Sequence, residues 1–370
     1  MMIEVFRPNM GDEEVAEVSS VLRSGWIGLG PKTAEFEKRF AAFSGTGYCV
    51  GLSSGTAALD MAMKLLEVNH GHEVIVPTMT FVSTAHAVCS NLATPIFVDV
   101  DPVTMNLDIE DVERKISPRT RAIIPVHYGG RPVDMDALRQ IAGDIPIVED
   151  CAHAAGSRYM GKPVGGLGDI GCFSFHAVKN LAMGDGGAIT MNHHAWYERA
   201  KKLRWLGIDK GTWDRTEMDR SYWWEYQVEE IGLKCHMNDI SASIGLVQLK
   251  KLPKMNARRR DIVRMYMEGL GDIEQVELPP QDDDQYESSW HIFHIKCESR
   301  DELSIFLQEN KINTGVHYKP IHVYPCYGNR TYLKTAEALF KCILSLPMYP
   351  SLTDGQVEYV IEKIRQFYSR

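Results

Sequence analysis

The sequence predicts an α/β fold in which a mostly parallel sheet is covered by helices and followed by a smaller α+β unit. Between residues 48 and 149, five short apolar segments alternate with segments of helical pattern. The apolar segments include VIVP, PIFV, AIIPV and IPIV, which are apolar at successive positions. Parallel strands that are buried on both faces have this character. After residue 286 the pattern changes to one alternating strand followed by helices, which indicates a second, smaller unit.

The expected elements follow one another in a simple order. Helices are predicted over 11–24 and 33–43, on either side of a glycine-rich loop at 25–31. The alternating region contains strands at 48–52, 73–76, 95–98, 121–126 and 145–149, and helices at 55–66, 80–90, 109–116 and 135–142. A helical pattern also runs from about 238 to 270, where Pro253 should kink or split the helix. We expect a large domain over 1–250 and a small domain over 251–370.

Composition narrows the class of protein. The chain has 370 residues, of which 44% are hydrophobic and 24% charged, and its formal net charge is −9. An acidic chain argues against a nucleic-acid-binding surface. The eight cysteines form no CxxC pair, the N-terminus lacks the features of a signal peptide, and no apolar run reaches membrane-spanning length. We therefore expect a cytoplasmic enzyme with packing cysteines and with neither a nucleic acid nor a membrane as partner.

The most informative stretch is DIGCFSFHAVKNLAMGDGGA, at residues 169–188. The apolar run from Ile170 to Phe175 indicates a buried strand, and Lys179 follows it by four residues. A glycine-rich loop then precedes a second apolar run. A lysine that is desolvated at the end of a buried strand loses proton affinity and becomes a nucleophile towards carbonyl groups. An isolated lysine on a loop is more often a surface charge, so Lys179 is a candidate because of the residues found with it.

A pair of acidic residues ends another predicted strand. Glu149 and Asp150 follow an apolar run, and adjacent residues of a strand point to opposite faces. Only one of the two can therefore enter a given cleft, and the carboxyl end of a parallel strand is where clefts form in such sheets. His153 should lie near Asp150 after a turn. A helix cap or a loop ion pair would explain the same acidic residues.

Two further motifs have competing interpretations. Ser54, Gly55 and Thr56 follow a strand and open a helix, where free N–H groups and the helix dipole favour an anion, although an ordinary N-cap explains them as well. The glycines at 166, 168 and 171 match the spacing of a dinucleotide-binding fingerprint, but they precede a strand, whereas that motif must follow a strand and open a helix.

We expect no metal site at His317 and His322, since a proline interrupts any helix between them and no suitable carboxylate or thiol accompanies them.

Taken together, these segments resemble the DegT/StrS-type nucleotide-sugar aminotransferases, which are pyridoxal phosphate (PLP) enzymes of fold type I. The resemblance covers nearly the whole chain, because nine segments stand in the order and spacing of the family. These segments are SSGTAAL, EVIVPTMTF, ATPIFVDVD, IVEDCAHAAGS, GCFSFHAVKN, GDGGAIT, SASIGLVQL, GVHYKPIH and LSLPMYPSLT. The resemblance implies a large domain with a mostly parallel seven-stranded sheet and a small C-terminal α+β domain.

The resemblance also implies roles for individual residues. Lys179 matches the Schiff-base lysine, and Asp150 matches the carboxylate that keeps the pyridine nitrogen protonated, so that the ring can accept electrons. His153 stands where the family has Gln or His near the 3-oxygen of the ring, and Phe81 stands where a side chain covers the ring face. The positions that match phosphate-binding residues of the family are Ser54, Gly55, Thr56 and Ser174.

One segment departs from the family pattern. Many members carry a GYNYRM-like segment whose Asn reaches the PLP phosphate of the other subunit, whereas this chain has GLKCHMND at 232–239. Lys234 takes the place of that Asn, and an ammonium group suits a phosphate. His236 stands in place of an Arg. The resemblance therefore implies a homodimer with shared active sites, in which Lys234 serves the neighbouring site.

The activity implied is transfer of an amino group from an amino acid, by analogy L-glutamate, to a keto-deoxyhexose linked to a nucleoside diphosphate. The segment VHYGGRP at 126–132 favours amination at C4 by its likeness to the family. Candidate substrate-binding residues are His317, Tyr318, Lys319 and His322, and the basic helix at 199–204 is a further candidate for the diphosphate. A PLP-dependent sugar dehydratase and a non-catalytic PLP-binding regulatory protein are the alternatives. Dehydratases of the family carry His in place of the lysine, so Lys179 favours transamination.

Overall fold

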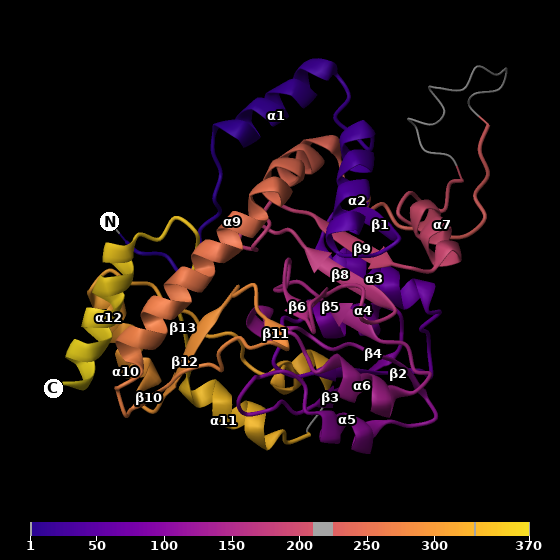
Figure 1. The fold of residues 1–370 in the computed structure, drawn as a ribbon. Helices are drawn as coiled ribbons and strands as arrows, with labels where there is room; N and C mark the ends of the chain where they lie inside the picture. The colour runs from indigo at the N-terminus through magenta and orange to yellow at the C-terminus, as the bar shows by residue number, and fades with distance from the viewer. Residues whose placement is uncertain (1, 210–224, 329–330, 370) are drawn as a thin grey trace.

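The computed structural model describes residues 2–209, 225–328 and 331–369 (Figure 1). Its central feature is a sheet of seven strands. These strands are β1 (Tyr48–Leu52), β2 (Glu73–Pro77), β3 (Thr94–Val98), β4 (Thr120–Ile123), β5 (Val148–Asp150), β8 (Ile170–Ser174) and β9 (Gly187–Met191). The orders β1-β9-β8-β5 and β3-β2-β4 are joined by parallel bridges from Ile123 to Ile147 and from Val126 to Asp150. Only β9 runs antiparallel to its neighbours in this sheet, so the predicted mostly parallel sheet is confirmed.

Both faces of the sheet are buried, as the continuous apolar strands predict. Alternate residues of one strand enter different hydrophobic clusters: Val74 and Val76 of β2 belong to one cluster, and Ile75 belongs to another. In β8, Cys172 and Phe173 divide in the same way. Because side chains alternate between the faces of a strand, this division requires a covering layer on each side.

The helices of this part of the chain begin and end close to their predicted positions, and the first of them packs on α9 (Asp239–Leu270) rather than on the sheet. They are α1 (Asp12–Ser24), α2 (Pro31–Phe43), α3 (Gly55–Leu65), α4 (Ser83–Ser90), α5 (Ile109–Lys115), α6 (Met135–Ala142) and α7 (His194–Leu203). Side-chain caps fix several starts, since Asp108 accepts from backbone N–H groups of α5 and Asp134 accepts from one of α6. Gly25, with φ of 74°, ends α1 in the left-handed region. Among the described residues, no helix combines the length and apolar content needed to cross a membrane.

The C-terminal part forms a separate α+β unit with its own hydrophobic cluster. Its antiparallel sheet has the order β10 (Val276–Glu277), β12 (Phe293–Cys297) and β13 (Ile343–Leu346), accompanied by α10 (Arg300–Glu309), α11 (Lys334–Cys342) and α12 (Asp354–Tyr368). A second small sheet joins β6 (Arg158–Tyr159), β7 (Lys162–Pro163) and β11 (Tyr286–Glu287). Ile3 belongs to the C-terminal cluster and pairs with Ile312, so the N-terminal segment also reaches this unit. The domain boundary at 250 and 251 stays a prediction.

One long helix connects the two parts. Helix α9 (Asp239–Leu270) contains 32 residues and continues through Pro253, so the proline does not split it, and the alternative, a kink at the proline, stays a prediction. Leu252 and Met255, on either side of the proline, are buried in a cluster with the sheet, whereas Ile262 and Tyr266 lie in the C-terminal cluster. Packing along the helix therefore offsets the hydrogen bond that the proline removes. Figure 1 shows α9 crossing the molecule from α1 and α2 to α12.

Candidate active site

A cavity of about 340 Å³ lies at the carboxyl ends of β5 and β8, beside the start of α3. Its walls come from the sheet, from α4, from the N-terminal segment and from the C-terminal unit. Predicted site residues that line it are Ser54, Gly55, Thr56, Phe81, Asp150, His153, Ser174, Lys179, His317 and Tyr318. Brought together from across the chain, these residues make the cavity the candidate active site.

Asp150 presents a buried carboxylate to this cavity. One carboxylate oxygen accepts a hydrogen bond from Thr84 Oγ1 at 2.9 Å, and the other accepts from the backbone N–H of Ala152 at 3.1 Å. Burial raises the pKa of Asp150, while these two hydrogen bonds and the nearby Lys179 oppose the rise. An ionised carboxylate offers about four acceptor positions, so the group retains capacity to bind a protonated ring nitrogen.

Lys179 provides the amine of the cavity. It is half-buried, and its backbone N–H donates to His176 O at 2.8 Å in the turn that follows β8. Burial lowers the pKa of Lys179 to about 8, although the Asp150 charge acts in the opposite direction. Gly184, with φ of 85°, lies in the loop that returns the chain to β9, and it adopts the left-handed backbone that the glycine-rich sequence predicts. The amine is therefore partly deprotonated near neutral pH, as a nucleophile must be.

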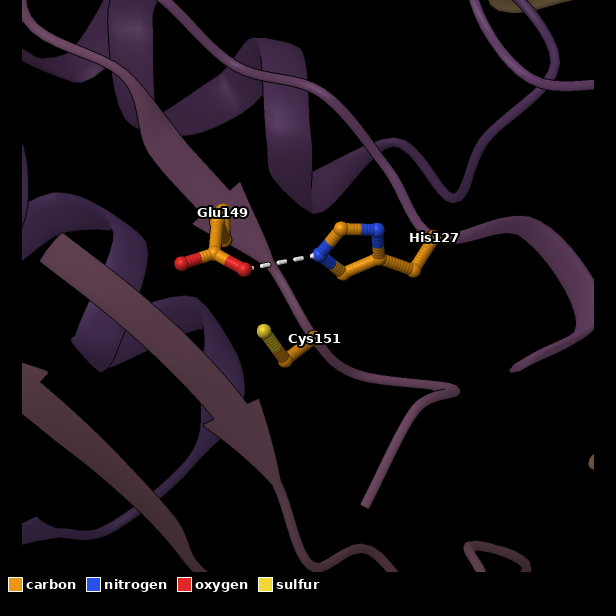
Figure 2. Close-up of side chains that lie close together, drawn as sticks. All are labelled: His127, Glu149 and Cys151. Atoms are coloured by element: carbon orange, nitrogen blue, oxygen red, sulfur yellow. Dashed lines mark hydrogen bonds and ion pairs between the residues drawn. The ribbon is translucent and has the colours of Figure 1, made fainter. Parts of the chain in front are cut away.

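Glu149 points away from the cavity, as strand alternation predicts. Its two carboxylate oxygens accept hydrogen bonds from the backbone N–H groups of Gly165, Leu167 and Gly168, at 2.8, 2.9 and 2.7 Å. His127 Nε2 donates to the same carboxylate at 3.0 Å (Figure 2). The glycine-rich loop before β8, whose sequence matches the dinucleotide fingerprint, thus binds the carboxylate of Glu149 and not a nucleotide phosphate.

His127, Glu149 and Cys151 lie close enough together to suggest a metal centre (Figure 2). Their atoms already have other uses. His127 Nδ1 accepts from the backbone N–H of Val133 at 3.1 Å, so its Nε2 carries the proton that is donated to Glu149. Burial and the charge of Glu149 raise the pKa of the Cys151 thiol, which disfavours the thiolate that a metal requires. We interpret this cluster as a hydrogen-bonded support for β5.

The start of α3 forms the expected anion cradle. Ser54 is the N-cap, and its hydroxyl accepts from the N–H of Ala57 at 3.1 Å, so the capping interpretation is correct for this side chain. The Thr56 hydroxyl bonds to Ser83 Oγ at 2.8 Å. A Cβ at Gly55 would lie only 2.7 Å from Ser174 Cβ, so a glycine is needed where β8 meets the helix. The helix N-terminus thus remains open to an anion such as a phosphate.

Aromatic rings line the opposite part of the cavity. His153 Nε2 and Tyr318 Oη lie 2.9 Å apart within hydrogen-bonding distance, and the two rings stack with centroids 5.9 Å apart. His153 Nδ1 is buried without a partner among the described residues. Phe81 is 58% exposed and faces Tyr318 at 6.4 Å. His317 Nδ1 bonds to Ser345 Oγ at 2.8 Å, which attaches this wall to β13.

Three predicted site residues are not among the residues that line this cavity in the described part of the chain. His322 is buried between Thr78 Oγ1, at 2.6 Å, and Glu337 Oε1, at 3.3 Å, and so joins α11 to the sheet. Lys319 is exposed and lies over the ring of Tyr324. Lys234 is exposed and lies 3.0 Å from the ring centroid of Trp205.

The basic helix α7 has little free charge. Arg199 binds Glu230 with N–O distances of 3.0 to 3.2 Å, and Lys202 binds Glu229 at 2.6 Å. Arg204 pairs with Glu37, and Lys201 pairs with Glu198. Each of these cations already has a carboxylate partner, which weakens α7 as a candidate for the diphosphate.

Sequence reasoning missed several residues of the cavity wall. Thr84 reaches Asp150 from the next layer, and Phe6 arrives from the N-terminal segment. His291 lines the cavity from a run that the sequence marks only as an alternating strand. Asn180 directly follows Lys179, but its buried amide contacts could not be inferred from that position alone. A signal existed only for Thr84, which lies one turn beyond the start of the helix predicted over 80–90.

Comparison with known proteins places these features in a family. The chain matches the DegT/DnrJ/EryC1/StrS aminotransferase family over residues 8–365. It belongs to this family. The spore coat polysaccharide biosynthesis protein SpsC of Bacillus subtilis (strain 168) is 38% identical over 372 residues, which cover 97% of this chain and 95% of SpsC.

Solved structures of similar proteins agree with this membership. The sugar aminotransferase CalS13 from Micromonospora echinospora shares 31% identity with a TM-score of 0.91, over 99% of this chain and 100% of that chain. Spr1654 from Streptococcus pneumoniae, solved in its PLP form, shares 34% identity with a TM-score of 0.92, over 100% and 99% of the two chains. The predicted fold and the predicted class, a PLP-dependent sugar aminotransferase, are thereby confirmed.

The residues that line the cavity of this protein fit PLP, the cofactor of the family. The start of α3 suits a phosphate, because Ser54, Gly55 and Thr56 line the cavity at a helix N-terminus. Asp150 has unused acceptor capacity inside a low-dielectric cavity, and Lys179 offers an amine with a lowered pKa. These three features line one cavity of about 340 Å³.

Lys179 should react with acylating reagents at a lower pH than ordinary lysines. In the cofactor-free protein, trace labelling with acetic anhydride followed by peptide mass spectrometry should give a half-maximal rate near pH 8. An ordinary lysine has a pKa of about 10.4, so under about 1% of it is neutral at that pH. The Asp150 charge raises the pKa of Lys179, so Asp150→Asn should move the midpoint below that of the unaltered protein. A midpoint near 10 would contradict the desolvation that lowers the pKa of Lys179.

Substitution of the two adjacent carboxylates should separate chemistry from stability. Asp150→Asn can keep its amide oxygen as acceptor for the Ala152 N–H and donate from its NH2 group to the Thr84 hydroxyl. The free energy of unfolding should therefore change by less than about 1 kcal/mol, while turnover falls roughly a hundredfold or more. Glu149→Gln leaves backbone N–H groups without acceptors, so it should lose about 2–4 kcal/mol of stability and retain most turnover per folded molecule. Urea unfolding and steady-state kinetics measure both. Equal losses of turnover would contradict the opposite orientations of the two side chains.

Proposed function

We propose that the protein transfers an amino group from L-glutamate to a keto-deoxyhexose linked to a nucleoside diphosphate, with amination at C4. The observation that carries this proposal is the convergence of Lys179, Asp150 and the open start of α3 on one cavity. Family membership supports the reaction class. The sugar position, the nucleotide linkage and the donor rest on the resemblance, and they define what has to be measured.

In the proposed reaction, bound PLP supplies a carbonyl group for amine exchange and a ring that takes up electrons. Asp150 holds a proton on the ring nitrogen by its negative charge. Lys179 would hold the cofactor through Nζ, and its amine, once free, would carry the proton that is removed from the donor α-carbon. A pKa of about 8 suits this task, because both protonation states are populated near neutral pH.

Tyr318 and His317 are the proposed substrate-binding residues that line the cavity, and Lys319 lies just beyond them. Lys319 is exposed, so we propose that it serves the diphosphate at the cavity mouth. His322 is enclosed by Thr78 and Glu337, and we propose that it supports the segment that carries these residues. A cytoplasmic location, and the expectation of neither a nucleic-acid nor a membrane partner, stay predictions.

A substrate panel tests the proposed function. Purified enzyme with PLP is incubated with L-glutamate and a series of nucleotide-linked 4-keto and 3-keto deoxyhexoses, and the products are identified by mass. A 4-keto substrate should gain an amino group and release 2-oxoglutarate. Preference for a 3-keto sugar would overturn the position, and loss of a hydroxyl group without amination would favour the dehydratase. Binding of PLP with no turnover of any substrate would favour a regulatory role.

We further propose a homodimer in which Lys234 serves the cofactor phosphate of the neighbouring subunit. Lys234 is exposed and does not line the cavity of its own chain. Its segment runs beside the start of α3, because Ser53 N–H donates to Cys235 O at 2.7 Å. A two-fold axis makes such a donation reciprocal.

Mixed dimers test this arrangement. Suppose that Lys179→Ala and Lys234→Ala homodimers are each severely impaired. Random exchange makes about half of the dimers mixed, and each mixed dimer has one site with both defects and one with neither, so roughly a quarter of all sites should become active. Activity should therefore return on mixing. Verified mixed dimers without activity would show that Lys234 does not act across an interface, and a fully active Lys234→Ala enzyme would remove its role altogether.

A further inference from the structure

Four rings form a continuous column along one wall of the cavity. Phe6 and His291 stack with centroids 4.9 Å apart and planes at 8°. His291 and His153 stack at 4.7 Å and 30°, and His153 and Tyr318 stack at 5.9 Å and 13°. All four residues line the cavity. His291 is therefore the ring that joins the N-terminal segment to the predicted cofactor-contacting His153.

A chain of buried amides fixes the orientation of His291. Asn256 Nδ2 donates to the backbone oxygen of Ala155 at 3.0 Å, so Asn256 Oδ1 is left to accept. It accepts from Asn180 Nδ2 at 3.1 Å, and the same Nδ2 donates to Ser289 O at 2.7 Å. Because backbone oxygens only accept, the two amides can be placed in one way only.

This orientation determines where the imidazole proton resides. Asn180 Oδ1 lies 3.1 Å from His291 Nδ1. An amide oxygen cannot donate, so Nδ1 must carry the hydrogen. Burial lowers the pKa of His291 well below its usual value, and the positive charges of Lys179 and Arg259 act in the same direction. His291 is thus a neutral ring held as the Nδ1–H tautomer.

We propose that His291 is a positioning residue for the transamination: its Nδ1–H anchors the side chain of Asn180 and so fixes the backbone that carries Lys179. The proposal rests on the proposed function for its kinetic consequences, but the geometry concerns the protein alone. Asn180 follows Lys179 directly in the chain, and its amide is tied to Asn256 and Ser289 from other segments. His291 completes the set of partners that keeps the amide from turning.

Three variants separate the hydrogen bond from the ring stack. His291→Phe keeps a ring but removes the donor, so Asn180 Oδ1 loses its partner in a buried site. We expect kcat to fall roughly tenfold to a hundredfold, with KM for the sugar changed by less than about threefold. His291→Asn places an amide nitrogen where Nδ1 lies, and it should retain kcat within about threefold. His294→Phe is the matched control, because His294 is buried without hydrogen-bond partners among the described residues and does not line the cavity.

Two measurements on the cofactor-free protein do not depend on turnover. In ¹⁵N NMR of histidine-labelled protein, assigned by loss of the signal in His291→Asn, His291 should show the neutral Nδ1–H pattern throughout pH 6 to 9. The midpoint for acetic anhydride labelling of Lys179 should rise in His291→Phe, as the amine gains solvent, and stay near 8 in His291→Asn.

These outcomes decide the proposal. An Nε2–H or doubly protonated His291 would overturn it even if a variant fails to fold, because that measurement uses the unaltered protein. An Asn variant as impaired as the Phe variant, or a Phe variant with unchanged kcat and labelling midpoint, would also overturn it. If the NMR and labelling results agree with the proposal but no sugar is aminated, the proposed function fails and the positioning role stands.

Discussion

The alternation of side chains at the end of β5 is the constraint on which the site depends. It sends Asp150 into the cavity and Glu149 to the opposite face. Glu149 accepts hydrogen bonds from three backbone N–H groups of the loop before β8 and from His127 Nε2. The hydrogen bonds of Glu149 therefore hold the end of β5 on the face away from the cavity, while the Asp150 carboxylate remains available for chemistry inside it.

The cavity combines burial with opposite charges in a way that suits its amine. Burial disfavours the charged forms of both Asp150 and Lys179, and each charge partly restores the other. The walls come from distant parts of the chain, because Phe6, His291 and Tyr318 enter from the N-terminal segment and the C-terminal unit. The site thus lies where the smaller unit meets the sheet, and α9 joins the two hydrophobic clusters beneath it.

Much of this could be predicted because it depends on local patterns. Continuous apolar strands such as EVIVP predict a doubly covered sheet, and the position of Lys179 after β8 predicts a reactive amine. Contacts between distant segments could not be predicted in this way. The sequence does not show that His322 would be enclosed by Thr78 and Glu337, or that Asn180 would meet His291. The continuation of α9 through Pro253 could not be predicted either, because it depends on packing on both sides of the proline.

The central claim is that Lys179 is the amine that holds the cofactor, and borohydride reduction of the PLP-loaded enzyme tests it most directly. Hydride reduction should leave the cofactor attached covalently to one lysine, which peptide mass spectrometry identifies. The label should be on the peptide that contains Lys179, and Lys179→Ala enzyme incubated with PLP under the same conditions should carry no label. A label on another lysine of the unaltered enzyme would contradict the assignment of the site.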